Sequence, residues 1–222
     1  MEITPNVHLI RDSIVNAYLV IGADGLSLVD TGIRGNARAI LKAIHHLGYA
    51  PADIRHIFIT HCDGDHVGGV AILKTMTTAT VYANPIEALA MSIGSASREY
   101  DTSGLNGRLF QSFGFMFQCQ PAQADALLAQ DIVTDLHGGM QALLTAGHTP
   151  GHVSYFLPSE GVLFGGDSLV VEGGQIHAAH GLTTWDQARA DSSARMQAGL
   201  GAQIVCLGHG LVTEQASSKF MV

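Results

Sequence analysis

The chain has 222 residues, of which 47% are hydrophobic and 14% charged, and its formal net charge is −8. An acidic chain without a block of Lys or Arg is unsuited to a nucleic-acid surface, and the lack of a run of about 18 apolar residues excludes an ordinary membrane-spanning helix. Three widely spaced cysteines, and a start without the basic and apolar regions of a secretory signal, indicate a reducing compartment, so we expect a cytoplasmic protein.

The first part of the sequence alternates between predicted strands and helices. Short runs rich in β-branched and aromatic residues predict strands at residues 7–10, 15–21, 26–29, 54–59 and 80–83. Apolar residues at helical spacing predict helices at residues 36–47 and 70–74. Strands followed in this way by helices favour an architecture in which the helices pack outside a sheet.

The segment from residue 85 to about residue 123 breaks this regularity. A helix is predicted from Pro85 to Met91, residues 92–107 are rich in Ser and Gly, and four phenylalanines lie within residues 109–117. A long irregular segment inside a domain is usually a lid or an interface, although the phenylalanines could also simply pack the segment onto the body. We expect one domain over residues 1–222, with this segment inserted as a lid that covers an apolar acyl or alkyl group.

The second part of the sequence is mainly composed of predicted strands. They are expected at residues 131–134, 141–145, 153–157, 161–164 and 203–207. One helix is predicted from Thr184, where Thr184 and Gln187 fit a capping box, to about Gln197.

Metal-ligand side chains are concentrated directly after the predicted strand at 54–59. Side chains on a strand alternate, so His61 and Asp63 should point the same way, and the following turn should bring Asp65 and His66 to the same place. Two imidazoles and two carboxylates this close together are typical of a site for a divalent cation. The alternative is a solvated polar turn.

The same pattern recurs at three further strand ends, where His148, Asp167 and His209 each follow a predicted strand and stand beside glycine. A lone histidine is more often structural than functional. Recurrence at four strand ends instead predicts one site assembled from strand-end loops.

Five motifs occur in a fixed order along nearly the whole chain. They are Asp30-Thr31-Gly32, Thr60-His61-Cys62-Asp63-Gly64-Asp65-His66-Val67-Gly68-Gly69, Gly147-His148-Thr149-Pro150-Gly151-His152, Gly166-Asp167 and Gly208-His209-Gly210. This set resembles the metallo-β-lactamase superfamily, in particular its lactonase and glyoxalase II-like branch. The resemblance implies a four-layer αββα sandwich of two mixed sheets, with a two-metal site along one edge of the sheets.

The resemblance also assigns roles to individual residues. The first metal ion would be held by His61, Asp63 and His148, the second by Asp65, His66 and His209, with Asp167 bridging the two. Asp30 would accept an imidazole N–H from behind the ligands. His152 is expected to make a structural hydrogen bond. His180 is either a substrate contact or an ordinary loop residue.

Asp63 departs from the usual family motif, which has histidine at this position. The negative charges of three carboxylates and one hydroxide equal the positive charge of two divalent ions, whereas the usual site keeps a net charge of +1. The pKa of the bound water should therefore be higher than in the usual site. A carboxylate is also a harder ligand than imidazole, which makes iron or manganese possible beside the expected zinc. If Asp63 turns away from the metal, the first site weakens and the enzyme becomes effectively mononuclear.

We therefore expect a dinuclear metal-dependent hydrolase. A metal-bound hydroxide would attack the carbonyl of a small ester, thioester, lactone or amide, and Asp65 would orient this nucleophile and pass its proton to the leaving group. Two alternatives stay open: an iron-dependent redox enzyme similar to a sulfur dioxygenase, and a metal-binding module without turnover. The expected partner is a small-molecule substrate, and a homodimer is compatible with the sequence.

Overall fold

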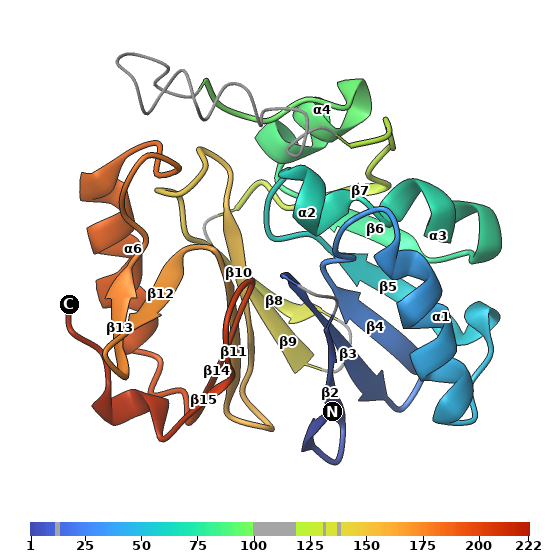
Figure 1. Ribbon diagram of the computed structural model, residues 1–222, viewed down its shortest axis with the longest axis horizontal. Helices are drawn as coiled ribbons and strands as arrows, with labels where there is room; N and C mark the ends of the chain where they lie inside the picture. The colour runs from blue at the N-terminus through green and yellow to red at the C-terminus, as the bar shows by residue number, and fades with distance from the viewer. Residues whose placement is uncertain (12–13, 100–118, 131, 137–138) are drawn as a thin grey trace.

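The computed structural model describes residues 1–11, 14–99, 119–130, 132–136 and 139–222. Two β-sheets face each other in the middle of the molecule, with α1 and α3 outside one sheet and α6 outside the other (Figure 1). The predicted αββα sandwich is therefore confirmed.

The first sheet has seven strands in the order in which they occur in the chain. They are β1 (Glu2–Thr4), β2 (Val7–Arg11), β3 (Asn16–Gly22), β4 (Gly25–Val29), β5 (Ile54–Phe58), β6 (Thr80–Ala83) and β7 (Ala126–Leu127). The strands from β1 to β4 pair antiparallel, whereas β4, β5, β6 and β7 pair parallel. The associated helices are α1 (Asn36–His46), η1 (Pro51–Asp53), α2 (Gly64–Val67), α3 (Val70–Met76) and α4 (Pro85–Ile93).

The second sheet has six strands in the order β15-β14-β11-β10-β9-β8. Their bounds are β8 (Ile132–Leu136), β9 (Met140–Leu144), β10 (Val153–Leu157), β11 (Val162–Gly166), β14 (Ile204–Leu207) and β15 (Thr213–Glu214). Among the described residues of this sheet, β11 and β14 pair parallel and the other neighbouring strands pair antiparallel. The remaining elements are the hairpin of β12 (Leu169–Glu172) and β13 (Gln175–Ala178), helix α6 (Gln187–Ala198) and η4 (Ala216–Ser218).

Aromatic side chains fill the space between the sheets and support the strand ends. Phe58 and Tyr155 pack with ring centroids 5.3 Å apart, and Tyr18 and Phe164 pack at 5.4 Å. The Tyr155 hydroxyl donates to the Ile59 carbonyl at 2.7 Å, directly beyond β5. Because a buried hydroxyl needs a partner, this bond fixes the strand end that precedes the predicted ligands.

One sequence prediction is wrong in its bounds, and another concerns residues that the structure does not describe. Helix α6 begins at Gln187 rather than Thr184, because the Asp186 carboxylate caps it by accepting from the Arg189 N–H at 3.1 Å. The phenylalanine-rich segment 109–117 falls outside the described residues, so the lid stays a prediction.

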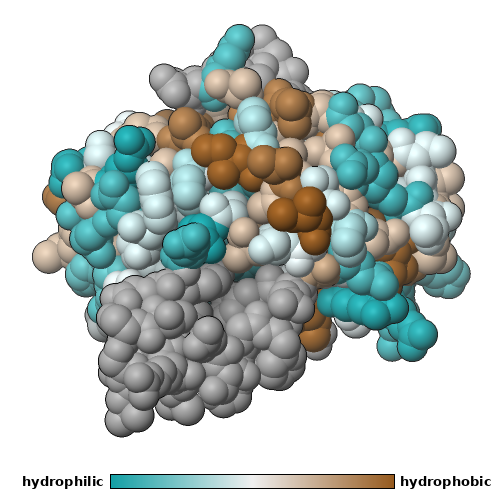
Figure 2. Space-filling model, turned by 90° about the horizontal axis from the view of Figure 1, so that it is seen from above, coloured by the Kyte–Doolittle hydropathy of each residue, from teal (hydrophilic) through white to brown (hydrophobic). Residues whose placement is uncertain are grey.

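Helix α4, which opens that predicted insertion, turns an apolar face outward. Figure 2 looks onto this side of the molecule and shows hydrophobic residues gathered at its centre. On α4 the exposed apolar side chains are Ile86, Leu89 and Ile93. Among the described helices, none is long and apolar enough to cross a bilayer.

Candidate metal centre

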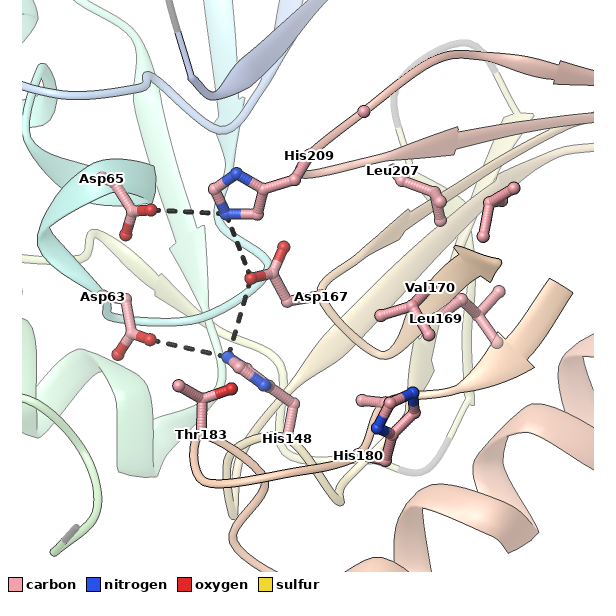
Figure 3. A pocket seen from close by; sticks show the side chains of 13 residues that line it. Asp63, Asp65, His148, Asp167, Leu169, Val170, His180, Thr183, Leu207 and His209 are labelled. Carbon is pink, nitrogen blue, oxygen red and sulfur yellow. Dashed lines mark ion pairs between the residues drawn. The ribbon is translucent and has the colours of Figure 1, made fainter. Parts of the chain in front are cut away.

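The predicted ligands meet where parallel strands end. Asp30 follows β4 and His61 follows β5, while Asp167 follows β11 and His209 lies just beyond β14. Parallel strands bring their carboxyl ends to the same edge, so each sheet delivers its loops to one place. The loop between β9 and β10 adds His148. Side chains far apart in sequence thus gather around one point (Figure 3).

The second donor group consists of Asp65, His66, Asp167 and His209. His209 Nε2 lies 3.4 Å from Asp65 Oδ2 and 3.3 Å from Asp167 Oδ2. His66 Nε2 lies 3.4 Å from Asp167 Oδ1 and 4.0 Å from Asp65 Oδ2. A tetrahedral ion with bonds of about 2.0–2.1 Å holds its ligand atoms about 3.3–3.4 Å apart. Three of these separations match that spacing, whereas His66 Nε2 lies farther from Asp65, and His66 and His209 face different oxygens of Asp167. The second donor group can therefore hold one divalent ion once its two carboxylates adjust.

Hydrogen bonds fix which imidazole nitrogen each histidine offers. His66 Nδ1 donates to Asp30 Oδ2 at 2.8 Å, and His209 Nδ1 donates to the Ile14 carbonyl at 2.7 Å. The Nε2 atoms then keep their lone pairs, as metal ligands require. Within the described residues, His66 Nε2 is buried and has no hydrogen-bond partner. An orphaned buried acceptor pointing at two carboxylates is what a missing cation would leave.

Asp30 organises this arrangement from behind. Its carboxylate also accepts from the Thr60 N–H at 2.8 Å and the Thr60 hydroxyl at 2.7 Å, and Thr60 Oγ1 accepts in turn from His61 Nδ1 at 3.0 Å. Asp30 adopts φ 57°, a left-handed conformation that is uncommon for a residue with a side chain. Such strain is typical of functional sites, and the contact between Asp30 and an imidazole is the one expected from the sequence.

The charges of the second donor group are strongly coupled. Burial alone would raise the pKa of Asp167, but the His66 and His209 side chains hold it well below its usual range. Burial would lower the pKa of His209, yet Asp167 and Asp65 raise it to about 10. The pKa of His66 is also raised well above its ordinary value, against burial, by Asp167, Asp65 and Asp30. Without a metal ion, protons on the imidazoles provide the positive charge that the carboxylates require.

The first donor group consists of His61, Asp63 and His148. Asp63 Oδ2 lies 3.5 Å from both His61 Nε2 and His148 Nε2, and all three side chains are buried. The spacing resembles that of a metal site. The structure thus brings together all seven predicted ligands, with Asp167 between the two groups.

A further residue, Arg98, enters the first donor group and was missed from the sequence. Its Nη1 and Nη2 atoms donate to Asp63 Oδ1 and Oδ2, each at 2.9 Å, and Nη2 lies 3.3 Å from His148 Nε2. Burial would raise the pKa of Asp63, but His148, His61 and Arg98 hold it well below its usual range. The signal available in the sequence was indirect: a carboxylate that replaces histidine in a buried site needs a counter-charge.

The loops around Arg98 are joined by the buried carboxylate of Glu87 on α4. Glu87 accepts from the Cys62 N–H at 2.8 Å, from the Gly151 N–H at 3.0 Å and from the Ser97 hydroxyl at 3.0 Å. One side chain thus links the ligand loop after β5, the loop that carries His148 and the residue preceding Arg98. The segment that carries Arg98 is therefore held to the site by hydrogen bonds.

Other motif residues position the ligands. His152 Nε2 accepts from the Asp167 N–H at 3.2 Å while Nδ1 donates to Thr145 Oγ1 at 2.9 Å, so His152 makes structural hydrogen bonds as expected. Gly208 is required for close approach, because a Cβ atom there would clash with Asp167 Oδ1 and lie 2.5 Å from His66 Cε1.

The donor groups open into a pocket of about 500 Å³. Asp63, Asp65, His148, Asp167 and His209 gather on one side of it, and Leu169, Val170 and Leu207 line another (Figure 3). His180 lines the pocket but is half-exposed and pairs with Glu172 at 3.0 Å. The apolar wall comes largely from β12, a strand that was not predicted from the sequence. The run Leu169-Val170-Val171 followed by Gly173-Gly174 was the available signal for this hairpin.

Comparison with known proteins places this geometry among known folds. The model of the metallo-beta-lactamase superfamily matches residues 10–209. The chain is 27% identical over 215 residues to the protein YobT of Bacillus subtilis, covering 92% of this chain and 87% of YobT. It is 26% identical over 196 residues to the thioesterase pkgB of Emericella nidulans, covering 88% of this chain but only 45% of pkgB. The chain therefore spans about half the length of this fungal relative.

A solved structure agrees with the sequence matches. A metallo-beta-lactamase mutant from Cronobacter sakazakii superimposes with a TM-score of 0.73 at 25% identity, covering 95% of this chain and 78% of that structure.

Proposed function

Because the chain belongs to the metallo-beta-lactamase superfamily, as its motifs predicted, we propose that it hydrolyses a small ester, thioester or lactone with a divalent ion held by the second donor group. At the coarser level of a metal-dependent hydrolase, the prediction is confirmed. The observation that supports the finer proposal is the gathering of two imidazoles and two carboxylates, at separations of 3.3–4.0 Å, beside an open pocket.

The chemistry divides between the ion and the side chains. A divalent ion would supply the charge that acidifies a water molecule and polarises a carbonyl group. Asp65 lies at the pocket and has a pKa below its ordinary value because the opposing effect of burial is exceeded by His66 and His209. Asp65 is thus ionised at neutral pH, and it would accept a proton from the attacking water and deliver it to the leaving group.

The pocket favours a substrate with an apolar part next to the reacting carbonyl. Leu169, Val170 and Leu207 would contact an acyl or alkyl group beside the donor groups. The thioesterase name of pkgB supports including thioesters in this class. Zinc is the proposed ion, because a set of two imidazoles and two carboxylates suits it.

The iron-dependent redox alternative rested on Asp63 as a hard additional ligand. Both oxygens of that carboxylate accept hydrogen bonds from Arg98. The argument for iron therefore loses its basis, and hydrolysis is the single function that we propose.

The test compares metal-free and zinc-loaded protein on a panel of esters, thioesters and lactones with acyl groups of increasing length. We expect hydrolysis only by the zinc-loaded protein. His209→Ala should lower zinc affinity by at least about tenfold and abolish most turnover. His45→Ala on the outer face of α1 is the matched control and should change neither. If the zinc-loaded protein hydrolyses no member of the panel, the proposal is refuted.

A further inference from the structure

We propose that the guanidinium of Arg98 takes the place of the first metal ion, so that the chain binds a single divalent ion, on the second donor group. The inference rests on the proposed function, which supplies that ion, and it adds the number of ions and the reason for it. It also explains why Asp63 stands where the superfamily usually has histidine.

The first argument is occupation of the ligands. Both oxygens of Asp63 accept from Arg98 at 2.9 Å, so a metal ion at the first site would have to share the carboxylate with the guanidinium. The same Nη2 atom lies 3.3 Å from His148 Nε2. Because a guanidinium can only donate, His148 Nε2 is the acceptor and its lone pair is also engaged. Two of the three atoms that would hold the first ion are thus turned to Arg98.

The second argument is charge. An arginine guanidinium keeps its proton at physiological pH, so Arg98 brings a permanent positive charge into the first donor group. A divalent ion bound there would meet that charge across a few ångströms in a buried site, where screening is weak. The side chains of Arg98 and Asp63 are 1% and 4% exposed, so little water is present to separate the two cations.

The third argument is that Arg98 is held in place. Bidentate pairing of a guanidinium with a carboxylate fixes both partners. The preceding Ser97 donates to Glu87 Oε1 at 3.0 Å, and Glu87 also accepts from the loops on both sides of the first donor group. Moving Arg98 away to admit a metal ion would break the bidentate pair and leave the guanidinium without its carboxylate partner in a buried site.

His61 can still bind metal under this proposal. Its Nε2 atom is buried and has no hydrogen-bond partner among the described residues, and a ring nitrogen of His61 lies within 4.8 Å of donor atoms of both His66 and Asp167. His61 is therefore available as an additional ligand to the single ion. Arg98 acts as a positioning residue, because it fixes Asp63 and His148 and is not among the residues that line the pocket.

The experiment is a measurement of zinc per chain by elemental analysis after chelator treatment, reloading and desalting. We expect one ion per chain for the natural sequence and for Arg98→Lys, which keeps the positive charge. Arg98→Met removes the charge at similar length and should raise the content to two. Arg98→Met combined with Asp63→Asn should return it to one, which would place the additional ion at Asp63. Arg38→Met on α1 is the matched control and should stay at one.

Thermal unfolding, followed with and without zinc, covers the case in which Arg98→Met is unstable. Metal-free Arg98→Met should unfold at a lower temperature than the natural protein. Zinc should raise the unfolding temperature of Arg98→Met by more than it raises that of Arg98→Lys. If it folds only with zinc, it should be refolded in zinc and should then contain two ions. Asp63→His with Arg98→Met, which restores the usual superfamily ligand, should also contain two.

The outcomes separate this inference from the proposed function. Two ions per chain in the natural protein would overturn the role of Arg98 and leave the metal-dependent hydrolase standing. One ion in both Arg98→Met and the Asp63→His combination would also overturn it. No bound zinc in the folded natural protein would overturn both the inference and the proposed function.

Discussion

Replacing Asp30 by asparagine tests how the structure selects the metal-binding nitrogen of His66. The Asp30 carboxylate accepts three hydrogen bonds, from the Thr60 N–H, the Thr60 hydroxyl and His66 Nδ1. Asparagine is of the same size and tolerates the left-handed backbone. With its amide oxygen toward the Thr60 N–H, its NH₂ group would face His66 Nδ1. That nitrogen must then accept instead of donating, which moves the His66 proton to Nε2.

The expected magnitude follows from this change of tautomer. A protonated Nε2 cannot bind metal, so zinc must first displace the proton and break the new hydrogen bond. Loss of such a supporting contact typically lowers metal affinity about 10- to 100-fold, or about 1.4–2.7 kcal/mol. The loss of stability without metal should be smaller, because the Thr60 hydroxyl can rotate and accept from the new amide.

The assay is zinc competition against a chromophoric chelator at pH 7.5, with urea unfolding of the metal-free protein alongside. Asp24→Asn, an exposed change in the hairpin between β3 and β4, is the control and should keep full affinity. Zinc affinity within about threefold of the natural value in folded Asp30→Asn would refute the reasoning, because it would mean that Asp30 does not set the His66 tautomer.

Three further predictions address charge, close approach and the pocket. Metal-free protein should lose stability as the pH rises from 6.5 to 8.5, because folding raises the pKa of His209 from its ordinary value of about 6.5 to about 10. Such a group stabilises the folded state fully below its unfolded-state pKa and progressively less above it. Calorimetry of chelator-treated protein should show this loss of stability, and His209→Gln should reduce it. Gly208→Ala should lower zinc affinity by about tenfold or more in competition assays because the added Cβ displaces Asp167, whereas Gly35→Ala, with open space around its Cβ position, should not. Val170→Thr should raise KM for esters with apolar acyl groups roughly threefold to tenfold with little change in kcat, and steady-state kinetics showing no dependence on acyl length would contradict an apolar subsite.

The clustering of the predicted ligands could be expected from the sequence because their positions depend on local rules. His61, His148 and His209 each lie shortly after a strand, His148 and His209 stand beside glycine, and strand ends are where a packed scaffold places its loops. Alternation along the strand was enough to place Asp63 beside His61. The parallel pairs β4–β5 and β11–β14 then determine that the separate loops meet.

Arg98 could not be predicted because its role depends on a tertiary approach. It lies in a Ser-rich stretch without periodicity, and its contact with Asp63 spans 35 positions in the chain. The hairpin of β12 and β13 was missed for another reason: each strand has four residues, and short strands give little alternation to detect. The start of α6 was misplaced because both Thr184 and Asp186 are good capping residues and only the latter forms the bond.

The origin of the donors in both sheets has a consequence for the order of folding. Asp65 and His66 lie on α2, which follows β5 of the first sheet, whereas Asp167 and His209 come from loops of the other sheet. The proposed ion would therefore have a complete set of ligands only when the two sheets have docked. A metal ion cannot then guide either half of the chain to its fold. It would bind late, stabilise the native state more than the folding transition state, and act mainly by slowing unfolding.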